Sequence, residues 1–233
     1  MKRAYQKATV APVGGQWHVL LDDKPLRSPA RRLIELPNVQ LAETIAAEWS
    51  AQGDSIDLKT MPVMRLAATA IDWVASNRDR VIELTASYAE TDLLCYRAER
   101  PVELVARQQA IWQPLIDWAS LRFDAPLIVT SGVMPRRQPP QVAAVVRSAV
   151  AAYETLPLMA VHSITVSCGS VILGLALTSG HVDAEAVWQA SQLDESFQIE
   201  RWGEDAEASR RRAALRADIE ASARLVRLLR AVS

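Results

Sequence analysis

Residues 9–21 read TVAPVGGQWHVLL, with strand-forming residues on both sides of Gly14 and Gly15. A Gly-Gly pair between two such runs indicates a β-hairpin, because glycine adopts the positive φ angles of a two-residue turn without penalty. The stretch DDKP at residues 22–25 is typical of a further turn, and residues 32–36 are a candidate third strand. The start of the chain therefore predicts a small antiparallel sheet.

A helix is predicted directly after this sheet, over residues 39–52. Asn38 is a favourable N-cap, and Gly53 suits the end of the helix. The apolar side chains of this segment recur every four residues: Leu41, Ile45 and Trp49. The polar, aperiodic stretch at residues 54–60 predicts a linker. We therefore expect an N-terminal α+β domain over residues 1–60.

The rest of the chain, residues 61–233, is expected to be mostly helical. Pro114 is expected to kink or break the helix in which it lies. Residues 155–182 contain no Asp, Glu, Lys or Arg, but polar, glycine and proline residues interrupt the apolar run that a membrane span requires. Two short core helices, or a helix and a strand, are favoured there. The predicted fold class is α+β, with a small N-terminal domain of antiparallel strands and a helix, and a larger, mostly α-helical C-terminal domain.

The composition limits the classes of function. The 26 Lys and Arg residues against 27 Asp and Glu residues give a net charge of -1, which argues against a general nucleic-acid binder. Cys95 and Cys168 are far apart in apolar surroundings, so we expect two buried, reduced thiols and neither a disulfide nor a metal site. No signal region or long leader is seen at the start of the chain, which predicts a cytoplasmic location.

Sequence motifs for catalysis are missing. There is no P-loop, nucleophile elbow or complete dinucleotide fingerprint. The histidines are not at metal-ligand spacings: His18, His162 and His181. No catalytic residue, metal or cofactor is therefore assigned. The alternative is a small-molecule enzyme that uses Glu90, Asp92 or Glu195 as acid or base, which would require a deep pocket and a perturbed carboxylate.

Four stretches together resemble a known family. They read LDDKPLRSP (21–29), LAETIAAEWSAQG (41–53) followed by MP (61–62) and RLA (65–67), YAETDLLCYRA (88–98) and LDESFQIERWGED (193–205). In this order they are similar to the ATP synthase F1 assembly chaperone family, in the branch that binds the α subunit, called the "ATP twelve" family, and to its bacterial members. The first stretch departs from the family's pattern, because Asp23 replaces a glycine and Ser28 replaces a threonine.

This resemblance implies a two-domain protein without catalytic activity. Members of the family bind the unassembled α subunit of the F1 sector, prevent its aggregation and release it when the β subunit offers its own surface. An isolated α subunit exposes an apolar face meant for β, and such a face favours aggregation. The resemblance implies no cofactor, no nucleic acid and no stable membrane insertion, and we expect a monomer. A third hypothesis, a permanent structural subunit, predicts stable co-purification with an assembled complex.

The resemblance also implies site residues. The family's sensitive acidic position, in the pattern L-D-E-x-F-Q, carries over to Glu195, with Asp194 as the adjacent alternative. We hypothesise that Glu195 anchors a basic group of the α subunit, while neighbouring residues supply most of the affinity. The expected client-binding residues are Asp194, Glu195, Phe197, Gln198 and Trp202. Trp49 is expected to pack in the core, and Glu90 and Asp92 are structural motif positions. Whether Glu195 contacts the client or orders the last two helices stays open.

Overall fold

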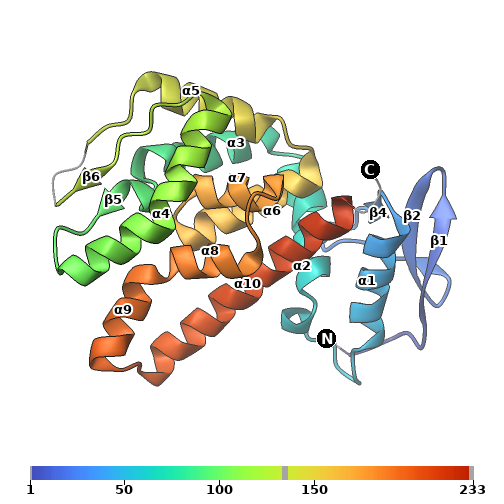
Figure 1. The fold of residues 1–233 in the computed structure, drawn as a ribbon. Helices are drawn as coiled ribbons and strands as arrows, with labels where there is room; N and C mark the ends of the chain where they lie inside the picture. Colours follow the sequence, from blue (N-terminus) through green and yellow to red (C-terminus); the bar gives the residue numbers. More distant parts are fainter. Residues whose placement is uncertain (1, 133–135, 231–233) are drawn as a thin grey trace. The chain divides into compact units, whose positions relative to one another are not determined.

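The computed structural model describes residues 2–132 and 136–230. As far as they are described, these residues form two compact units. The first unit comprises Met1–Arg78, Thr155–Met159 and Arg224–Ser233. The second unit comprises Asp79–Glu154 and Ala160–Ala223. Figure 1 follows the chain from blue at the N-terminus to red at the C-terminus. The division into domains 1–60 and 61–233 stays a prediction.

The predicted hairpin lies in the first unit. Strands β1 (Ala8–Val13) and β2 (Gln16–Leu21) pair antiparallel, with Val13 opposite Gln16. Gly14 and Gly15 between them have φ angles of 60° and 84°, the conformations for which glycine is required. Two short strands, β3 (Lys24–Pro25) and β4 (Glu35–Leu36), also pair antiparallel with β2. The candidate third strand is therefore limited to its last two residues.

Helix α1 (Val39–Ser50) packs against β1 and β2 (Figure 1). Its N-cap is Asn38, as predicted, because the Asn38 side chain accepts a 2.8 Å hydrogen bond from the Leu41 backbone N–H. The helix buries Leu41 and Ile45 completely. Hydrophobic burial of this face holds the helix on the sheet, since each fully buried apolar side chain contributes about 1.5–3 kcal/mol.

A buried carboxylate joins α1 to the next helix, α2 (Pro62–Thr69). Glu48 accepts hydrogen bonds of 3.0 and 2.8 Å from the backbone N–H groups of Val63 and Met64 in the first turn of α2. An acidic group is favoured there, because the first N–H groups of a helix have no partner within it. The 3-10 turn η1 (Leu58–Thr60) precedes α2, and the π-helical turn η2 (Ala70–Val74) follows it.

The second unit is mostly helical, so the predicted α+β fold class is confirmed. The helices lying wholly or partly in it are α3 (Arg78–Ala86), α4 (Val102–Phe123), α5 (Pro140–Ala151), α6 (Thr155–Cys168), α7 (Val171–Ser179), α8 (Ala184–Ser191), α9 (Leu193–Trp202) and α10 (Ala206–Arg230). Two 3-10 turns, η3 (Ser87–Thr91) and η4 (Leu93–Cys95), follow α3. The strands β5 (Tyr96–Arg97) and β6 (Thr130–Ser131) pair in parallel.

The charge-free segment at residues 155–182 forms two helices, α6 and α7, the first of the two predicted arrangements. Gly169, at a φ of 67°, ends α6, and the Ser170 hydroxyl caps α7 by accepting a hydrogen bond from the Leu173 N–H. All side chains from 171 to 178 are buried. Within the described residues, no helix has both the length and the apolar character that a membrane crossing requires.

Of the two expected effects of Pro114, a break is not found, and a kink stays a prediction. Helix α4 continues from Val102 to Phe123 with Pro114 inside it. Proline removes one backbone hydrogen bond and costs about 3 kcal/mol in a helix interior. The neighbouring side chains of Trp112, Leu115 and Ile116 are buried in the core of the second unit, and this packing holds the helix together across the proline.

Candidate functional site

Helix α9 carries all five predicted client-binding residues. Glu195, Gln198 and Trp202 follow the spacing i, i+3 and i+7, which places them on one face of the helix. Glu195 is partly exposed, Gln198 is exposed, and Trp202 is 76% exposed. We call these three residues the α9 surface. A largely exposed tryptophan beside polar groups is typical of a protein interface, because tryptophan is enriched among residues that carry binding energy.

Glu195 forms an exposed ion pair with α10. Its carboxylate lies 3.2 Å from the guanidinium of Arg211, and the two side chains are 34% and 68% exposed. A pair this accessible to water contributes only about 0–1 kcal/mol, because water and salt screen it. Glu195 can therefore exchange Arg211 for a cation of another protein at little cost in stability.

Asp194 has a different environment from its neighbour Glu195. It is half-buried, and its carboxylate accepts a 2.7 Å hydrogen bond from the Gln108 side chain of α4. Burial raises the pKa of Asp194, while Gln108 and the charge of Arg97 oppose the rise. Gln108 in turn accepts a hydrogen bond from the Ala98 N–H at 2.8 Å. Asp194 thus connects α9 to α4, and its client-binding role stays a prediction.

The buried side chain of Phe197 helps to hold α9 in place. Its side chain is only 4% exposed, and the guanidinium groups of Arg201 and Arg107 lie 4.2 and 5.2 Å from its ring centre. Such cation–π contacts contribute about 0.5–1 kcal/mol each at accessible sites. Arg107 also binds Glu200 at 2.8 Å. Phe197 leaves little exposed area for a partner. Its predicted contact with a client stays a prediction.

Glu90 and Asp92, the two acidic residues of the stretch at residues 88–98, have different environments. Glu90 is exposed, and its backbone carbonyl accepts a 3.2 Å hydrogen bond from the Tyr96 hydroxyl. Asp92 is fully buried and accepts hydrogen bonds of 3.0 and 3.1 Å from the N–H groups of Leu94 and Ile172. Burial raises the pKa of Asp92 to about 6, despite these donors at the start of α7. The geometry of Asp92 is that of a structural carboxylate that joins η4 to α7.

Trp49 lies in the core of the first unit, 6% exposed. The Tyr5 hydroxyl donates a 2.7 Å hydrogen bond to the Trp49 carbonyl, and the two rings meet edge to face at 5.5 Å. The indole Nε1 of Trp49 is buried without a hydrogen-bond partner among the described residues. This placement agrees with the predicted packing role.

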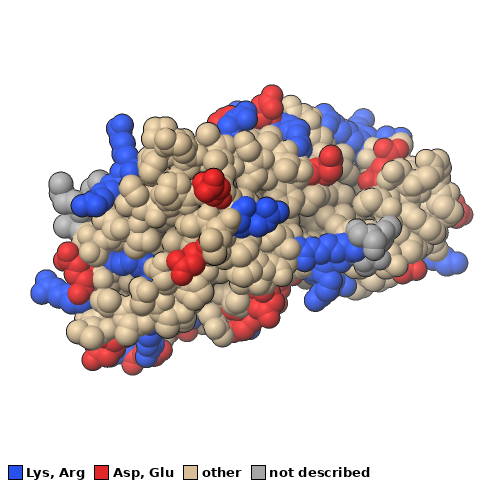
Figure 2. All heavy atoms as spheres, turned by 45° about the horizontal axis from the view of Figure 1, so that its top comes forward, with Lys and Arg blue, Asp and Glu red and all other residues tan. Residues whose placement is uncertain are grey.

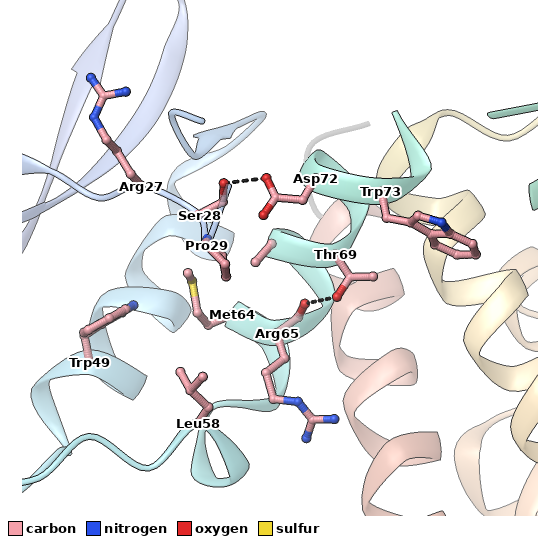
Figure 3. Close-up of a pocket in the computed structure, with 11 residues that line it drawn as sticks. Arg27, Ser28, Pro29, Trp49, Leu58, Met64, Arg65, Thr69, Asp72 and Trp73 are labelled. Atoms are coloured by element: carbon pink, nitrogen blue, oxygen red, sulfur yellow. Dashed lines mark hydrogen bonds between the residues drawn. The ribbon is translucent and has the colours of Figure 1, made fainter. Parts of the chain in front are cut away.

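Trp49 also lines two adjoining hollows of the first unit, which the sequence did not predict. The first hollow, of about 540 Å³, lies between the β3–β4 connection and α2 (Figure 3). The second, of about 660 Å³, lies on the N-terminal segment and the sheet. Both have Arg27 and Trp49 in their walls. The sequence signal for these hollows was that several of their wall residues, among them Arg27, Trp49 and Arg65, fall within the family-like stretches.

Charge is mixed over the visible surface. Figure 2 shows blue and red groups interspersed over the face it displays, in keeping with the net charge of -1. Within the described part of the chain, no group of three or more His, Cys, Asp or Glu side chains is arranged to hold a metal ion. Glu90, Asp92 and Glu195 are not among the residues that line either hollow.

The chain is similar to a family of chaperone proteins, to solved structures and to a mitochondrial relative. The family model described as the ATP12 chaperone protein matches residues 2–120. The crystal structure of Atp12 from Paracoccus denitrificans is 41% identical, with a TM-score of 0.92 and 98% of each chain covered. A solved protein from Agrobacterium tumefaciens has the same identity and TM-score, over 98% of this chain and 86% of that one. The mitochondrial atp12 protein of Schizosaccharomyces pombe is 24% identical over 215 residues, which cover 86% of this chain and 74% of the relative.

Proposed function

This chain belongs to the ATP12 chaperone protein family, and from that premise we propose that it binds the unassembled α subunit of the ATP synthase F1 sector. The membership confirms the family that the sequence motifs indicated, that of an F1 assembly chaperone. The choice of the α subunit as client is our proposal. So is the order of events, in which the chaperone shields α from aggregation and releases it when β offers its surface.

The α9 surface is the single observation that supports a client site most directly. Trp202 offers a large exposed ring, and Glu195 offers a carboxylate held only by a water-accessible pair. A client arginine or lysine can replace Arg211 as the partner of Glu195, while apolar contacts with Trp202 supply affinity. Such a site binds a client firmly enough to mask it and loosely enough to release it, because only a few residues carry the binding energy.

We also propose that the protein has no catalytic activity. The enzyme alternative depends on Glu90, Asp92 or Glu195. Asp92 is fully buried, and the other two carboxylates lie outside the two hollows. A monomeric state, a cytoplasmic location and the absence of nucleic-acid binding remain predictions.

The test is co-purification with isolated α subunit, together with the aggregation of α during incubation. We expect a complex with α on a sizing column, suppressed aggregation of α, and no complex with assembled F1. A complex that persists in assembled F1 would instead support a permanent structural subunit. If α is neither bound nor protected, the proposal is wrong, and assays should turn to small-molecule substrates.

A further inference from the structure

The two hollows beside Trp49 combine apolar walls with a charged rim. Pro29, Leu58, Met64 and Ala68 contribute apolar surface to the first hollow, and Leu58 is 51% exposed. Figure 3 shows Met64 at the centre, with Trp49 and Leu58 on one side of it. The π-helical turn η2 brings Asp72 and Trp73 to the wall of this hollow. Turns of this kind occur frequently at functional sites.

The second hollow continues the apolar surface past Trp49. Its walls include Tyr5, Pro25, Leu26 and Ile56. Each hollow has the volume of a ligand pocket, which is about 300–1,000 Å³ in proteins. Two hollows that share Arg27 and Trp49 in their walls suit two apolar side chains of the same extended or helical segment, a common form of peptide recognition.

Cations outnumber carboxylates around both hollows. The basic residues in their walls are Lys2, Lys24, Arg27 and Arg65. Among the described residues, Arg27 donates one side-chain hydrogen bond, to the Arg31 carbonyl, and so keeps most of its five N–H donors available. The Arg65 carbonyl accepts a 2.8 Å hydrogen bond from the Thr69 hydroxyl, and no hydrogen bond or ion pair of its guanidinium is found among the described residues. Figure 3 shows the Arg27 and Arg65 side chains extending away from the centre of the first hollow.

The two carboxylates in these walls are already used within the chain. Asp22 accepts hydrogen bonds from the backbone N–H groups of Gln6 and Lys7, at 2.9–3.1 Å. Asp72 accepts from the Ser28 hydroxyl and from the Ala30 N–H at 3.0 Å. The guanidinium groups of Arg27 and Arg65 are therefore available to a partner. The carboxylates of Asp22 and Asp72 are instead engaged in hydrogen bonds within the chain.

We propose that the two hollows bind an acidic segment of a client polypeptide, with large apolar side chains in the hollows and carboxylates paired with Arg27 and Arg65. This inference rests on the proposed chaperone function, because the segment belongs to an unassembled client. It adds a second contact region, in the first unit, with a charge preference opposite to that of Glu195. Arginine suits this role, because its planar fork can bind a carboxylate through two hydrogen bonds.

The experiment uses the full chain and two labelled peptides. The first is a short fluorescein-labelled peptide in which pairs of leucines alternate with pairs of glutamates. The second has lysine at every glutamate position. Fluorescence anisotropy measures binding of both to the wild type, to the double variant Arg27→Glu/Arg65→Glu, and to Leu58→Ser. Arg80→Glu is the matched control, because Arg80 is an exposed arginine of α3 in the second unit.

We expect the wild type to prefer the acidic peptide, with affinity that falls as salt rises. The double variant should lose about tenfold or more of this affinity and gain affinity for the lysine peptide. A reversed preference cannot come from misfolding. Leu58→Ser should weaken the binding of both peptides, and Arg80→Glu should leave the binding of both unchanged.

Equal binding of the two peptides by the wild type, or an equal loss in the Arg80→Glu control, overturns the inference. An absence of peptide binding also overturns it, even when α subunit is protected in the aggregation assay. If the wild type fails to protect α, the proposed function is wrong, whereas the peptide measurements still decide whether the hollows select acidic segments.

Discussion

The carboxylate of Glu195 either binds the client or stabilises the fold, and one substitution distinguishes these two roles. Glu195→Gln removes one exposed ion pair, so we expect the free energy of unfolding to change by no more than about 1 kcal/mol. Capture of α subunit should weaken by about tenfold or more, the usual effect of losing a hydrogen bond to a charged group. Urea denaturation and a pull-down of α measure the two quantities.

Glu200→Gln is the matched control for Glu195, because Glu200 lies on the same helix and also pairs with an arginine, Arg107. It should leave capture of α unchanged. A Glu195→Gln protein that melts early, and loses capture only in proportion to unfolding, would assign Glu195 a structural role.

Asp92 predicts a pH dependence of stability. Its pKa is raised to about 6 in the folded protein, chiefly by burial, against the ordinary 3.8. Between these values the folded state binds the proton more tightly than the unfolded state does, so stability falls as pH rises from about 4 to 6. The total loss is at most roughly 3 kcal/mol, and it is complete above about pH 7.

The measurement compares the wild type with Asp92→Asn by urea denaturation at several pH values. The amide of the variant has no charge to titrate, so the difference between the two proteins isolates this carboxyl from the other acidic groups. We expect the stability of the wild type relative to the variant to decrease through the window from pH 4 to 6. A constant difference across that window would show that the backbone donors of Leu94 and Ile172 offset the effect of burial.

At the scale of elements, the contact between α6 and α7 depends on one glycine. A Cβ atom at Gly174 would lie 2.7 Å from the Thr165 Oγ1 and 2.8 Å from the Val161 carbonyl oxygen. The carbonyl belongs to the α6 backbone and cannot move without the helix. Close packing against α6 explains why a glycine occupies this position.

We expect Gly174→Ala to destabilise the protein by about 1–3 kcal/mol through overpacking. This exceeds the gain of at most about 1 kcal/mol from the better helix propensity of alanine. Gly53→Ala is the control, because no atom lies within 4 Å of a Cβ there. Urea denaturation of both variants tests the prediction, and an equal or higher stability of Gly174→Ala would contradict it.

For the molecule as a whole, we expect substitutions of Trp49 to affect function through folding. Trp49→Arg would place a charge in the core and lose the packing of a large ring, at a cost of several kcal/mol. We expect this variant to unfold at a lower temperature and to lose protection of α together with its structure. Trp49→Phe keeps an aromatic ring, and the indole N–H has no hydrogen bond to a described residue that could be lost. It should therefore fold and protect α.

Thermal unfolding followed by circular dichroism, beside the aggregation assay of α, measures both variants. A Trp49→Arg protein that melts like the wild type but fails to protect α would show that Trp49 acts at the binding surface and not through folding.

The sequence by itself determined the features that arise from neighbouring residues. The Gly14-Gly15 hairpin and the Asn38 cap each depend on groups within a few positions of one another, so local signals were sufficient. For residues 155–182 the sequence left two arrangements open, and the structure shows the pair of helices. The motif order also identified the family. At Pro114 the local pattern left a break possible, but the helix continues, because core packing around Trp112 offsets the cost of a proline.

Which of these residues are exposed to water is set by the tertiary structure. Asp194 and Glu195 are adjacent in sequence, yet one is joined to α4 and the other faces water. The hollows beside Trp49 combine the N-terminal segment, the sheet and α2. The exposure of a side chain and the shape of a hollow depend on which distant segments pack around them. That packing is set by burial of the whole core, so a local sequence pattern does not predict it.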